Sequence, residues 1–392
     1  MKILVIHNFY QNTGGEDAVV KNEVKMLREN GSSVRLFSMD NRDILNFGFF
    51  KKMLFVFNAF FGIKTIIALR KIVREFRPEV AHIHNVLPLI SCSAYIYLKL
   101  AGIHIVQTVH NFRFICANGL FYIDGENCER CLRPSLYSLK KKCFRKNIAL
   151  TLMYDMIIGF WRYSGLYSFC INKFICLNEF GKDKMIKAGY PKDKIIVKGN
   201  FVEMSSARFR TKDVSEKYCL YLGRLSDEKG IAVLLKAFSG ICLLKLRIAG
   251  DGPLRGKVEA SDNRMVDYLG FVTGAKKAEL IRDAEFIIIP SVCYENFPVV
   301  IKEAAMLKIP AAVSNIGGLP ELVKDRITGI LFKPNDAVDL KDKIEYLARS
   351  PEICKKMGES AFSNAQEDYS KERHYQALLS IYNNAGGFNV RK

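Results

Sequence analysis

Two glutamates, Glu295 and Glu303, lie eight positions apart in the apolar stretch PSVCYENFPVVIKEAAM, residues 290–306. Carboxylates are costly to bury without partners. The pattern predicts a helix that begins near Phe297–Pro298, with Glu295 in the loop before it and Glu303 about two turns further on. The two carboxylates could then bind paired hydroxyls on either side of a phosphate, which the helix start would favour. The alternative is that both glutamates are surface residues of an amphipathic helix.

Two basic residues and two glycines follow other predicted strands of the same half of the chain. In YLGRLSDEKG, Arg224 and Lys229 could present two cations to a diphosphate, the arginine as a bidentate donor and the lysine as a point charge. In IAGDGP, Gly250 and Gly252 would allow close backbone approach or a turn with positive φ. Taken singly, these residues are better explained as solvated loop cations and an ordinary tight turn.

Short β-rich runs alternate with helical stretches along the chain, which predicts an α/β fold with parallel sheets covered on both faces. The pattern restarts near residue 218, and 392 residues suit two domains. We therefore expect two Rossmann-like, doubly wound domains, residues 1–200 and 201–370. An amphipathic C-terminal helix, residues 371–392, would pack back on the first domain. Ligands bind beyond the carboxyl ends of such strands, so a site is expected in the cleft between the facing domains.

The stretch from Glu295 to Glu303 resembles the E-x7-E motif of glycosyltransferase family 4, the retaining GT-B enzymes that use nucleotide-sugar donors. The resemblance covers nearly the whole chain, and the order of the pieces is more specific than any one of them. The chain departs from the family at one place. Where the family often has N-G-V-D before the second domain, this chain has GNFVE, in which no glycine follows Asn200. The difference affects the expected turn between the domains and not the expected chemistry. The matching pieces are a Gly-Gly loop after the first strand, VHN around His110, GRLSDEKG, AGDGP, LGFV, ENFPVVIKEA, and NIGGLPELV followed by TGILF.

The resemblance implies a role for each matching charged residue. Arg224 and Lys229 would bind the donor diphosphate and stabilise the charge of the leaving group. Glu303 would accept hydrogen bonds from the ribose hydroxyls, and Glu295 would contact hydroxyls of the transferred sugar. His110, from the first domain, would touch the donor sugar near the reacting carbon. The resemblance thus assigns Arg224, Lys229, His110 and Glu295 to catalysis and Glu303 to donor binding.

Other positions are expected to contribute mainly through the backbone. The Gly-Gly pair of the first loop would let that loop approach the phosphates and the acceptor. A later glycine pair would shape the turn beside the nucleotide. These backbone positions are Gly14, Gly15, Gly250, Gly252, Asn296, Phe297, Gly317 and Gly318.

In the family's usual mechanism, the acceptor hydroxyl attacks on the face that the diphosphate leaves, and the departing phosphate oxygen takes the proton. Catalysis then depends on positioning and on cations where negative charge develops, so we expect no metal or cofactor for catalysis. A sugar-nucleotide epimerase of GT-B architecture is an alternative, but we identify no acid/base residues for it. A third alternative is an inactive binding module. The retention of four charged residues argues against it, namely Arg224, Lys229, Glu295 and Glu303.

Basic residues are concentrated in the first half of the chain. The net charge is +19, and residues 1–200 contain 30 Lys and Arg against 15 Asp and Glu. Such a surplus favours nucleic acid, an anionic membrane or a negatively charged substrate. We find no nucleic-acid-binding module and expect no nucleic acid as partner.

Residues 47–77 have seven Phe between positions 47 and 61, and over the whole segment seven Lys and Arg against one Glu. The longest uncharged run is too short to span a bilayer. This composition is typical of helices that lie in the interface of anionic membranes, although two core helices with solvated basic faces are the alternative.

Family members that build bacterial surface polysaccharide or lipopolysaccharide act on lipid-linked acceptors. The resemblance therefore implies a UDP- or GDP-sugar donor, a lipid-linked saccharide acceptor, and a cytoplasmic enzyme that is peripheral on the inner face of the cell membrane. The opening MKILVIHNFY is read as a first strand and not as a signal peptide.

Four of the eleven cysteines form the pattern C-x11-C-x2-C-x11-C within an insertion at residues 116–143. With no signal peptide, a reducing compartment is expected, where spaced cysteines suggest metal rather than disulfides. A C-x2-C pair with two flanking cysteines could complete a closed, structural zinc site beside His110. An iron–sulfur cluster and four reduced thiols are the alternatives. The four residues are Cys116, Cys128, Cys131 and Cys143.

Overall fold

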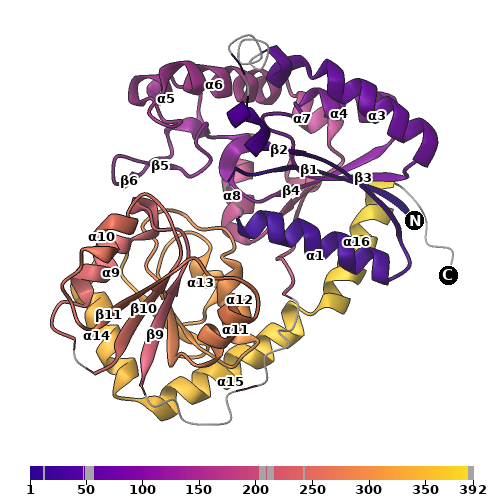
Figure 1. Cartoon of the computed structure of the whole chain (residues 1–392). Coiled ribbons are helices and arrows are strands. Elements are labelled where there is room, and N and C mark those ends of the chain that lie inside the picture. Colours follow the sequence, from indigo (N-terminus) through magenta and orange to yellow (C-terminus); the bar gives the residue numbers. More distant parts are fainter. Residues whose placement is uncertain are drawn as a thin grey trace. The chain divides into compact units, whose positions relative to one another are not determined.

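The computed structural model describes residues 1–11, 14–46, 48, 57–202, 209, 216–241 and 243–386. The chain forms two compact units, which we describe separately. Unit 1 comprises Met1–Leu120, Glu129–Asn200 and Lys371–Lys392, and unit 2 comprises Phe121–Cys128 and Phe201–Ser370. Each unit has a parallel six-stranded sheet with helices, so the expected α/β class with two Rossmann-like sheets is confirmed (Figure 1). Residues Phe121–Cys128, which the sequence analysis placed in the first domain, cluster with unit 2.

The sheet of unit 1 has the strand order β2-β1-β3-β4-β7-β8. Its central strands are almost wholly buried and mostly apolar, because helices cover both faces. Helices α1 and α16 lie on one face, and α3, α4, α6 and α7 lie on the other (Figure 1). The strands are β1 (Lys2–Phe9), β2 (Ser33–Asp40), β3 (Val80–Asn85), β4 (His104–Val109), β7 (Lys173–Cys176) and β8 (Ile195–Val197). The helices are α1 (Gly15–Glu29), α3 (Ile63–Phe76), α4 (Ser93–Leu100), α5 (Tyr137–Lys141), α6 (Ile148–Tyr163), α7 (Leu166–Cys170), α8 (Glu179–Lys187) and α16 (Lys371–Gly386).

The sheet of unit 2 has the strand order β11-β10-β9-β12-β13-β14. Its core contains fully buried apolar side chains of the central strands, such as Leu246 and Phe286. The strands are β9 (Tyr218–Leu222), β10 (Lys245–Ala249), β11 (Val266–Gly270), β12 (Phe286–Ile289), β13 (Ala311–Ser314) and β14 (Gly329–Phe332), and a short hairpin pairs β5 (Tyr122–Ile123) with β6 (Glu126–Asn127). The helices are α9 (Ile231–Ala237), α10 (Arg255–Glu259), α11 (Gly274–Arg282), α12 (Val299–Ala305), α13 (Leu319–Leu322), α14 (Ala337–Ala348) and α15 (Pro351–Asp368).

Helix α12 begins at Val299, directly after Pro298, as the sequence pattern predicted. Proline suits this position because its fixed φ fits the start of a helix and its missing N–H would have no partner there. Glu303 lies inside the helix and Glu295 lies in the loop before it.

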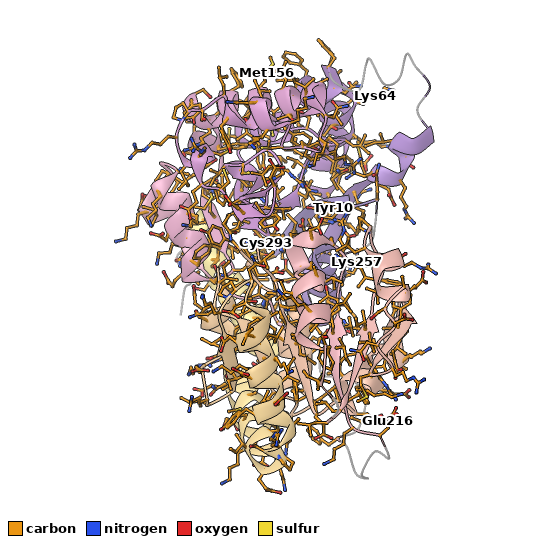
Figure 2. The ribbon with its side chains drawn as sticks, turned by 90° about the vertical axis from the view of Figure 1, so that its left-hand side faces the viewer. Tyr10, Lys64, Met156, Glu216, Lys257 and Cys293 are labelled. Atoms are coloured by element: carbon orange, nitrogen blue, oxygen red, sulfur yellow. The ribbon has the colours of Figure 1, made fainter. Side chains whose placement is uncertain are left out.

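The outer helices of unit 1 expose apolar side chains. Figure 2 shows Met156 of α6 and Lys64 of α3 at the surface of this unit. Over the residues that the structure describes, no helix is both long enough and apolar enough to cross a membrane. Of the segment 47–77, positions 47 and 49–56 lie outside the described residues.

Candidate active site

The predicted charged residues of unit 2 follow its two central strands. The strand order changes direction between β9 and β12. In open α/β sheets, ligands bind beyond the carboxyl ends of the strands at such a point. The loop after β9 carries Arg224 and Lys229, and the loop after β12 carries Ser291 and Glu295. The topology of the sheet therefore brings these four residues to one edge.

Lys229 and Glu295 form an ion pair. The Nζ atom of Lys229 lies 2.5 Å from Oε1 of Glu295, and the Ser291 hydroxyl donates to the same oxygen at 2.6 Å. Burial disfavours the ammonium, but the Glu295 carboxylate outweighs this effect and raises the pKa of Lys229 above its ordinary value. The lysine therefore stays charged. From the sequence, the two side chains were expected on different parts of one ligand, and their contact with each other was not.

Glu303 has a partner that the sequence analysis missed. The Nζ atom of Lys277, on α11, lies 2.5 Å from Oε2 of Glu303, and both side chains are about one-quarter exposed. No local sequence signal links α11 to α12, so only the folded chain shows this pair. Arg224 is exposed, and its backbone carbonyl accepts a hydrogen bond from the Tyr221 hydroxyl at 2.6 Å, which holds the turn after β9.

Glycines bring the strand-end loops of unit 2 together. Gly250 has φ +150°, and a Cβ atom there would lie 1.8 Å from the carbonyl oxygen of Gly223, so no side chain fits. At Gly317, with φ +60°, a Cβ atom would lie 2.8 Å from the backbone nitrogen of Glu295, and the neighbouring N–H of Gly318 donates to the Glu295 carbonyl at 2.8 Å. At Gly250, the close backbone approach therefore occurs between two loops of the protein itself. Gly317 and Gly318 hold the loop that carries Glu295.

The remaining predicted positions of unit 2 lie in the same turns. Asn296 and Phe297 follow Glu295 directly and are buried, with 9% and 7% of their surface exposed. The Phe297 ring lies 5.5 Å from that of Tyr369. Gly252 lies two residues after Gly250, close to the backbone of Leu225. Contact of these residues with a donor stays a prediction.

In unit 1, His110 directly follows β4 and contacts His84 at the end of β3. Its Nε2 atom lies 2.9 Å from Nδ1 of His84, and the two rings are stacked. Burial holds the pKa of His110 well below its usual range, so the imidazole is neutral at neutral pH. Both histidines line a small cavity of about 30 Å³, together with Asn111 and Arg113.

The structure adds polar residues beside the first loop that the sequence analysis missed. The Tyr10 hydroxyl donates to Oε2 of Glu16 at 2.9 Å, and the Asn111 amide donates to the Tyr10 hydroxyl at 3.1 Å. Burial raises the pKa of Glu16 to about 7. Glu16 directly follows the Gly-Gly pair, and Asn111 directly follows His110. Their positions next to these motifs are the sequence signal that could have identified them as site residues.

Gly14 and Gly15 form the start of α1. The N–H of Gly14 donates to Oδ2 of Asp17 at 3.2 Å, while Oδ1 of the same carboxylate lies 2.8 Å from Nε2 of His7. Asp17 therefore ties the glycine loop to β1. Positions 12 and 13 of this loop lie outside the described residues.

Three of the four clustered cysteines lie close together in unit 1. The pKa of Cys131 is raised, first by a hydrogen bond with Cys116, then by burial, and further by the nearby Cys143. Cys128 clusters with unit 2. All four are thiols without a disulfide. The structural zinc stays a prediction.

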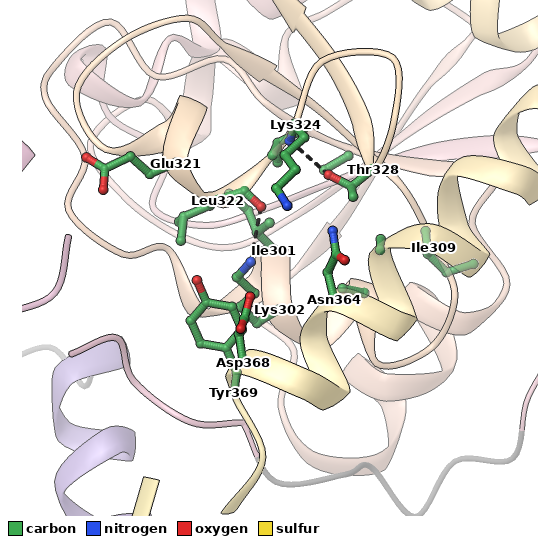
Figure 3. A pocket seen from close by; sticks show the side chains of 14 residues that line it. Ile301, Lys302, Ile309, Glu321, Leu322, Lys324, Thr328, Asn364, Asp368 and Tyr369 are labelled. Carbon is green, nitrogen blue, oxygen red and sulfur yellow. Dashed lines mark hydrogen bonds between the residues drawn. The ribbon is translucent and has the colours of Figure 1, made fainter. Parts of the chain in front are cut away.

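Unit 2 has a separate pocket that contains none of the predicted site residues. It lies between α12, α13 and α15 and is lined by Lys302, Leu322 and Tyr369 among others (Figure 3). The Nζ atom of Lys302 donates to the Leu322 carbonyl at 3.1 Å and lies 4.1 Å from the centre of the Tyr369 ring. Burial lowers the pKa of Lys302 to about 8.

Comparison with known proteins gives matches along most of the chain. Residues 13–206 match the family model described as Glycosyltransferase Family 4, and residues 205–364 match the model described as Glycosyl transferases group 1. An uncharacterized glycosyltransferase of Methanocaldococcus jannaschii is 31% identical over 43% of this chain and 45% of its own length. The chain thus spans about half the length of the curated relatives that it matches.

Solved structures share the fold over nearly the whole chain. Sucrose-phosphate synthase of Thermosynechococcus elongatus superposes with a TM-score of 0.73 at 16% identity, over 99% of this chain and all of that one. An Anabaena protein in complex with UDP-glucose gives a TM-score of 0.69 at 16% identity, over 97% of this chain and 98% of that chain.

Proposed function

Because the chain belongs to the family 4 glycosyltransferases of GT-B fold, we propose that it transfers a sugar, with retention, from a nucleotide-sugar donor to a hydroxyl of a saccharide acceptor. One observation carries this proposal: the Lys229–Glu295 pair at the point where the sheet of unit 2 changes direction. A cation and a carboxylate side by side suit the junction between a diphosphate and a sugar ring. The Anabaena protein of similar fold, which was crystallised with UDP-glucose, supports a UDP-sugar donor.

The residues of unit 2 divide the work on the donor. Lys229 and Arg224 stabilise the negative charge that develops on the diphosphate as the glycosidic bond breaks. Glu295 orients the hydroxyls of the transferred sugar, and Glu303 binds the ribose. In unit 1, the neutral imidazole of His110 is suited to hydrogen bonding with the donor sugar rather than to charge pairing. The leaving phosphate oxygen takes the proton of the attacking hydroxyl.

Two measurements test the donor. Thermal unfolding with a panel of UDP-, GDP- and other nucleotide sugars should show a rise in Tm for one donor class, because a bound ligand stabilises the folded protein. Product analysis with that radiolabelled donor then distinguishes the functions. Transfer to an acceptor with retention supports the proposal, whereas a new free sugar nucleotide indicates an epimerase, and no turnover of any donor indicates a binding module.

For the acceptor, we propose a lipid-linked saccharide at an anionic membrane, as in bacterial surface polysaccharide or lipopolysaccharide synthesis. The support is an apolar stripe on α6, made of large side chains at intervals of three or four residues, each between 44% and 58% exposed. Such a face is more apolar than an ordinary solvated helix surface. The residues of this stripe are Ile148, Leu152, Met156, Phe160 and Tyr163.

Helix α3 lies in the same layer of unit 1 as α6 (Figure 1) and also exposes large apolar side chains. Its Ile63 and Ile67 are 53% and 65% exposed, and it also presents exposed basic residues, among them Lys64 and Arg70. Apolar side chains beside cations match the interface of an anionic leaflet. This arrangement favours a cytoplasmic enzyme that is peripheral on the inner face of the cell membrane.

Vesicle sedimentation tests this surface. We expect the protein to bind vesicles that contain anionic phospholipid at low salt, and the double variant Met156→Glu with Phe160→Glu to lose most of this binding. Phe271→Glu is the matched control, because Phe271 is 66% exposed but lies in unit 2. Equal binding by the double variant and the control would refute the role of the α6 stripe.

A further inference from the structure

A buried group of three side chains with metal-binding chemistry lies in unit 1. Glu23 comes from α1, and His82 and His84 come from β3. One carboxylate oxygen and one nitrogen of each imidazole all lie within 4.8 Å of one another, and within the described parts of the chain this is the one such set. None of the three residues is more than 4% exposed.

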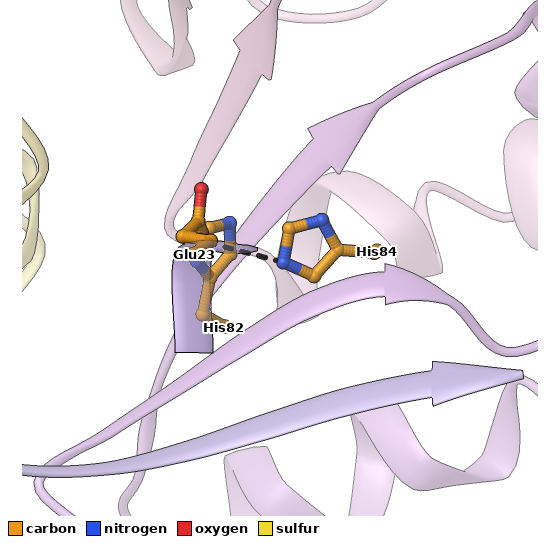
Figure 4. Close-up of side chains that lie close together, drawn as sticks. All are labelled: Glu23, His82 and His84. Atoms are coloured by element: carbon orange, nitrogen blue, oxygen red, sulfur yellow. Dashed lines mark ion pairs between the residues drawn. The ribbon is translucent and has the colours of Figure 1, made fainter. Parts of the chain in front are cut away.

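The local structure explains why these residues meet. Side chains two positions apart on a strand point to the same face, so His82 and His84 both project from one face of β3. Helix α1 lies against the sheet (Figure 1), and its Glu23 lies beside both rings (Figure 4). An aliphatic side chain would be the ordinary occupant of such a position.

The three possible ligand atoms lie close enough together to share one ion. Oε1 of Glu23 lies 2.8 Å from Nδ1 of His82 and 3.3 Å from Nε2 of His84. Ligands about 2.0–2.1 Å from a tetrahedral zinc lie about 3.3 Å from one another. Oε1 of Glu23 and Nε2 of His84 are both buried, and apart from the ion pairs within this group neither makes a well-aligned hydrogen bond. Buried polar atoms are normally satisfied, and a bound cation would complete the contacts of both.

The far nitrogens of both imidazoles are engaged. Nε2 of His82 lies 2.8 Å from Oγ1 of Thr108, and Nδ1 of His84 lies 2.9 Å from Nε2 of His110. A histidine that binds a metal nearly always donates its other N–H in this way, which fixes the tautomer and aims the remaining lone pair at the ion.

We propose that Oε1 of Glu23, Nδ1 of His82 and Nε2 of His84 bind one divalent transition-metal ion, of which zinc is the best match to this set of ligands. The Tyr382 hydroxyl of α16 lies 2.7 Å from the same nitrogen of His82 and is placed for a fourth position. The ion would fasten α1, β3 and the C-terminal helix to one another inside unit 1. Its role is structural, and the proposal does not rest on the glycosyl transfer proposed above, although the ligand His84 also contacts His110.

Metal analysis of the full-length protein tests this site, provided that the cysteines cannot contribute. The double variant Cys128→Ser with Cys131→Ser is purified without a His-tag and analysed by elemental mass spectrometry. It should retain one equivalent of metal per protein chain. Adding Glu23→Gln to this variant should abolish that equivalent. After exchange with Co²⁺, the site should show d–d absorption without the sulfur-to-metal charge transfer of a thiolate site.

A milder variant covers the case in which Glu23→Gln does not fold. Thr108→Val keeps all three ligands and removes only the partner of His82, so competition with a chelator should show metal affinity reduced about 10- to 100-fold. The proposal is wrong if the folded cysteine double variant holds less than about a tenth of an equivalent after dialysis against Zn²⁺ or Co²⁺. It is also wrong if Glu23→Gln folds and keeps the metal, or if Thr108→Val binds it as tightly as before.

Discussion

Replacing Lys229 by methionine removes the cation of the Lys229–Glu295 pair and keeps most of the side-chain length. If the ammonium stabilises the departing diphosphate, kcat should fall about 10²- to 10³-fold, which corresponds to about 2.7–4 kcal/mol of transition-state stabilisation. The exposed guanidinium of Arg224 remains and limits the loss to this range. Initial rates with radiolabelled donor at saturation measure the effect.

The same substitution should also lower stability, for a reason that can be separated from catalysis. Glu295 is 12% exposed and would lose its cation, while the Ser291 hydroxyl would still donate to it. A fully buried pair would cost several kcal/mol to break and an exposed pair almost nothing. Because Lys229 is 29% exposed, we expect the free energy of unfolding to fall by about 1–2 kcal/mol.

A double-mutant cycle distinguishes the two effects. Glu295→Gln removes the carboxylate that the lysine neutralises, so the double variant Lys229→Met with Glu295→Gln should recover the lost stability but not the lost activity. Thermal unfolding and initial rates of the four proteins complete the cycle. Near-normal kcat in Lys229→Met, or activity restored together with stability in the double variant, would refute the role of Lys229 in leaving-group stabilisation.

Three further predictions follow from charged side chains. Glu303→Gln should raise the KM for the donor about tenfold with little change in kcat, whereas Lys277→Met should not raise this KM. Steady-state kinetics measures both variants, and an equal rise in KM for the two would contradict the role of Glu303. Lys302→Met should stabilise the protein by about 1–3 kcal/mol at pH 7, because the pKa of this lysine is lowered to about 8 and its buried ammonium costs stability below that pH. The stability advantage of Lys302→Met over the unmodified protein should shrink between pH 8 and 10.5. A difference in Tm between the two proteins that stays constant over this pH range would contradict this explanation. Glu16→Gln should become stabilising as pH rises from 4.5 to 7, since over this window the carboxyl ionises in the unfolded chain while burial, with a pKa of about 7, keeps it protonated in the folded protein; a pH-independent difference in unfolding free energy would disprove this explanation.

The sequence alone determined the elements of the fold and the strand ends that carry the donor residues. Alternating apolar and helical runs are local signals, and parallel strands place the residues that follow them at one edge of the sheet. Arg224, Lys229 and Glu295 could therefore be placed from their positions after β9 and β12. The start of α12 could be predicted from Pro298, because the preference of proline for a first helical turn is also local.

Only the tertiary structure decided which side chains meet. Lys277 and Glu303 lie 26 positions apart on different helices, and Glu23 lies far along the chain from His82 and His84. Helix α6 is so apolar that its sequence is typical of a buried helix, and only its neighbours show which face remains exposed. Contacts of this kind depend on how elements pack, and no local pattern of residue types records that packing.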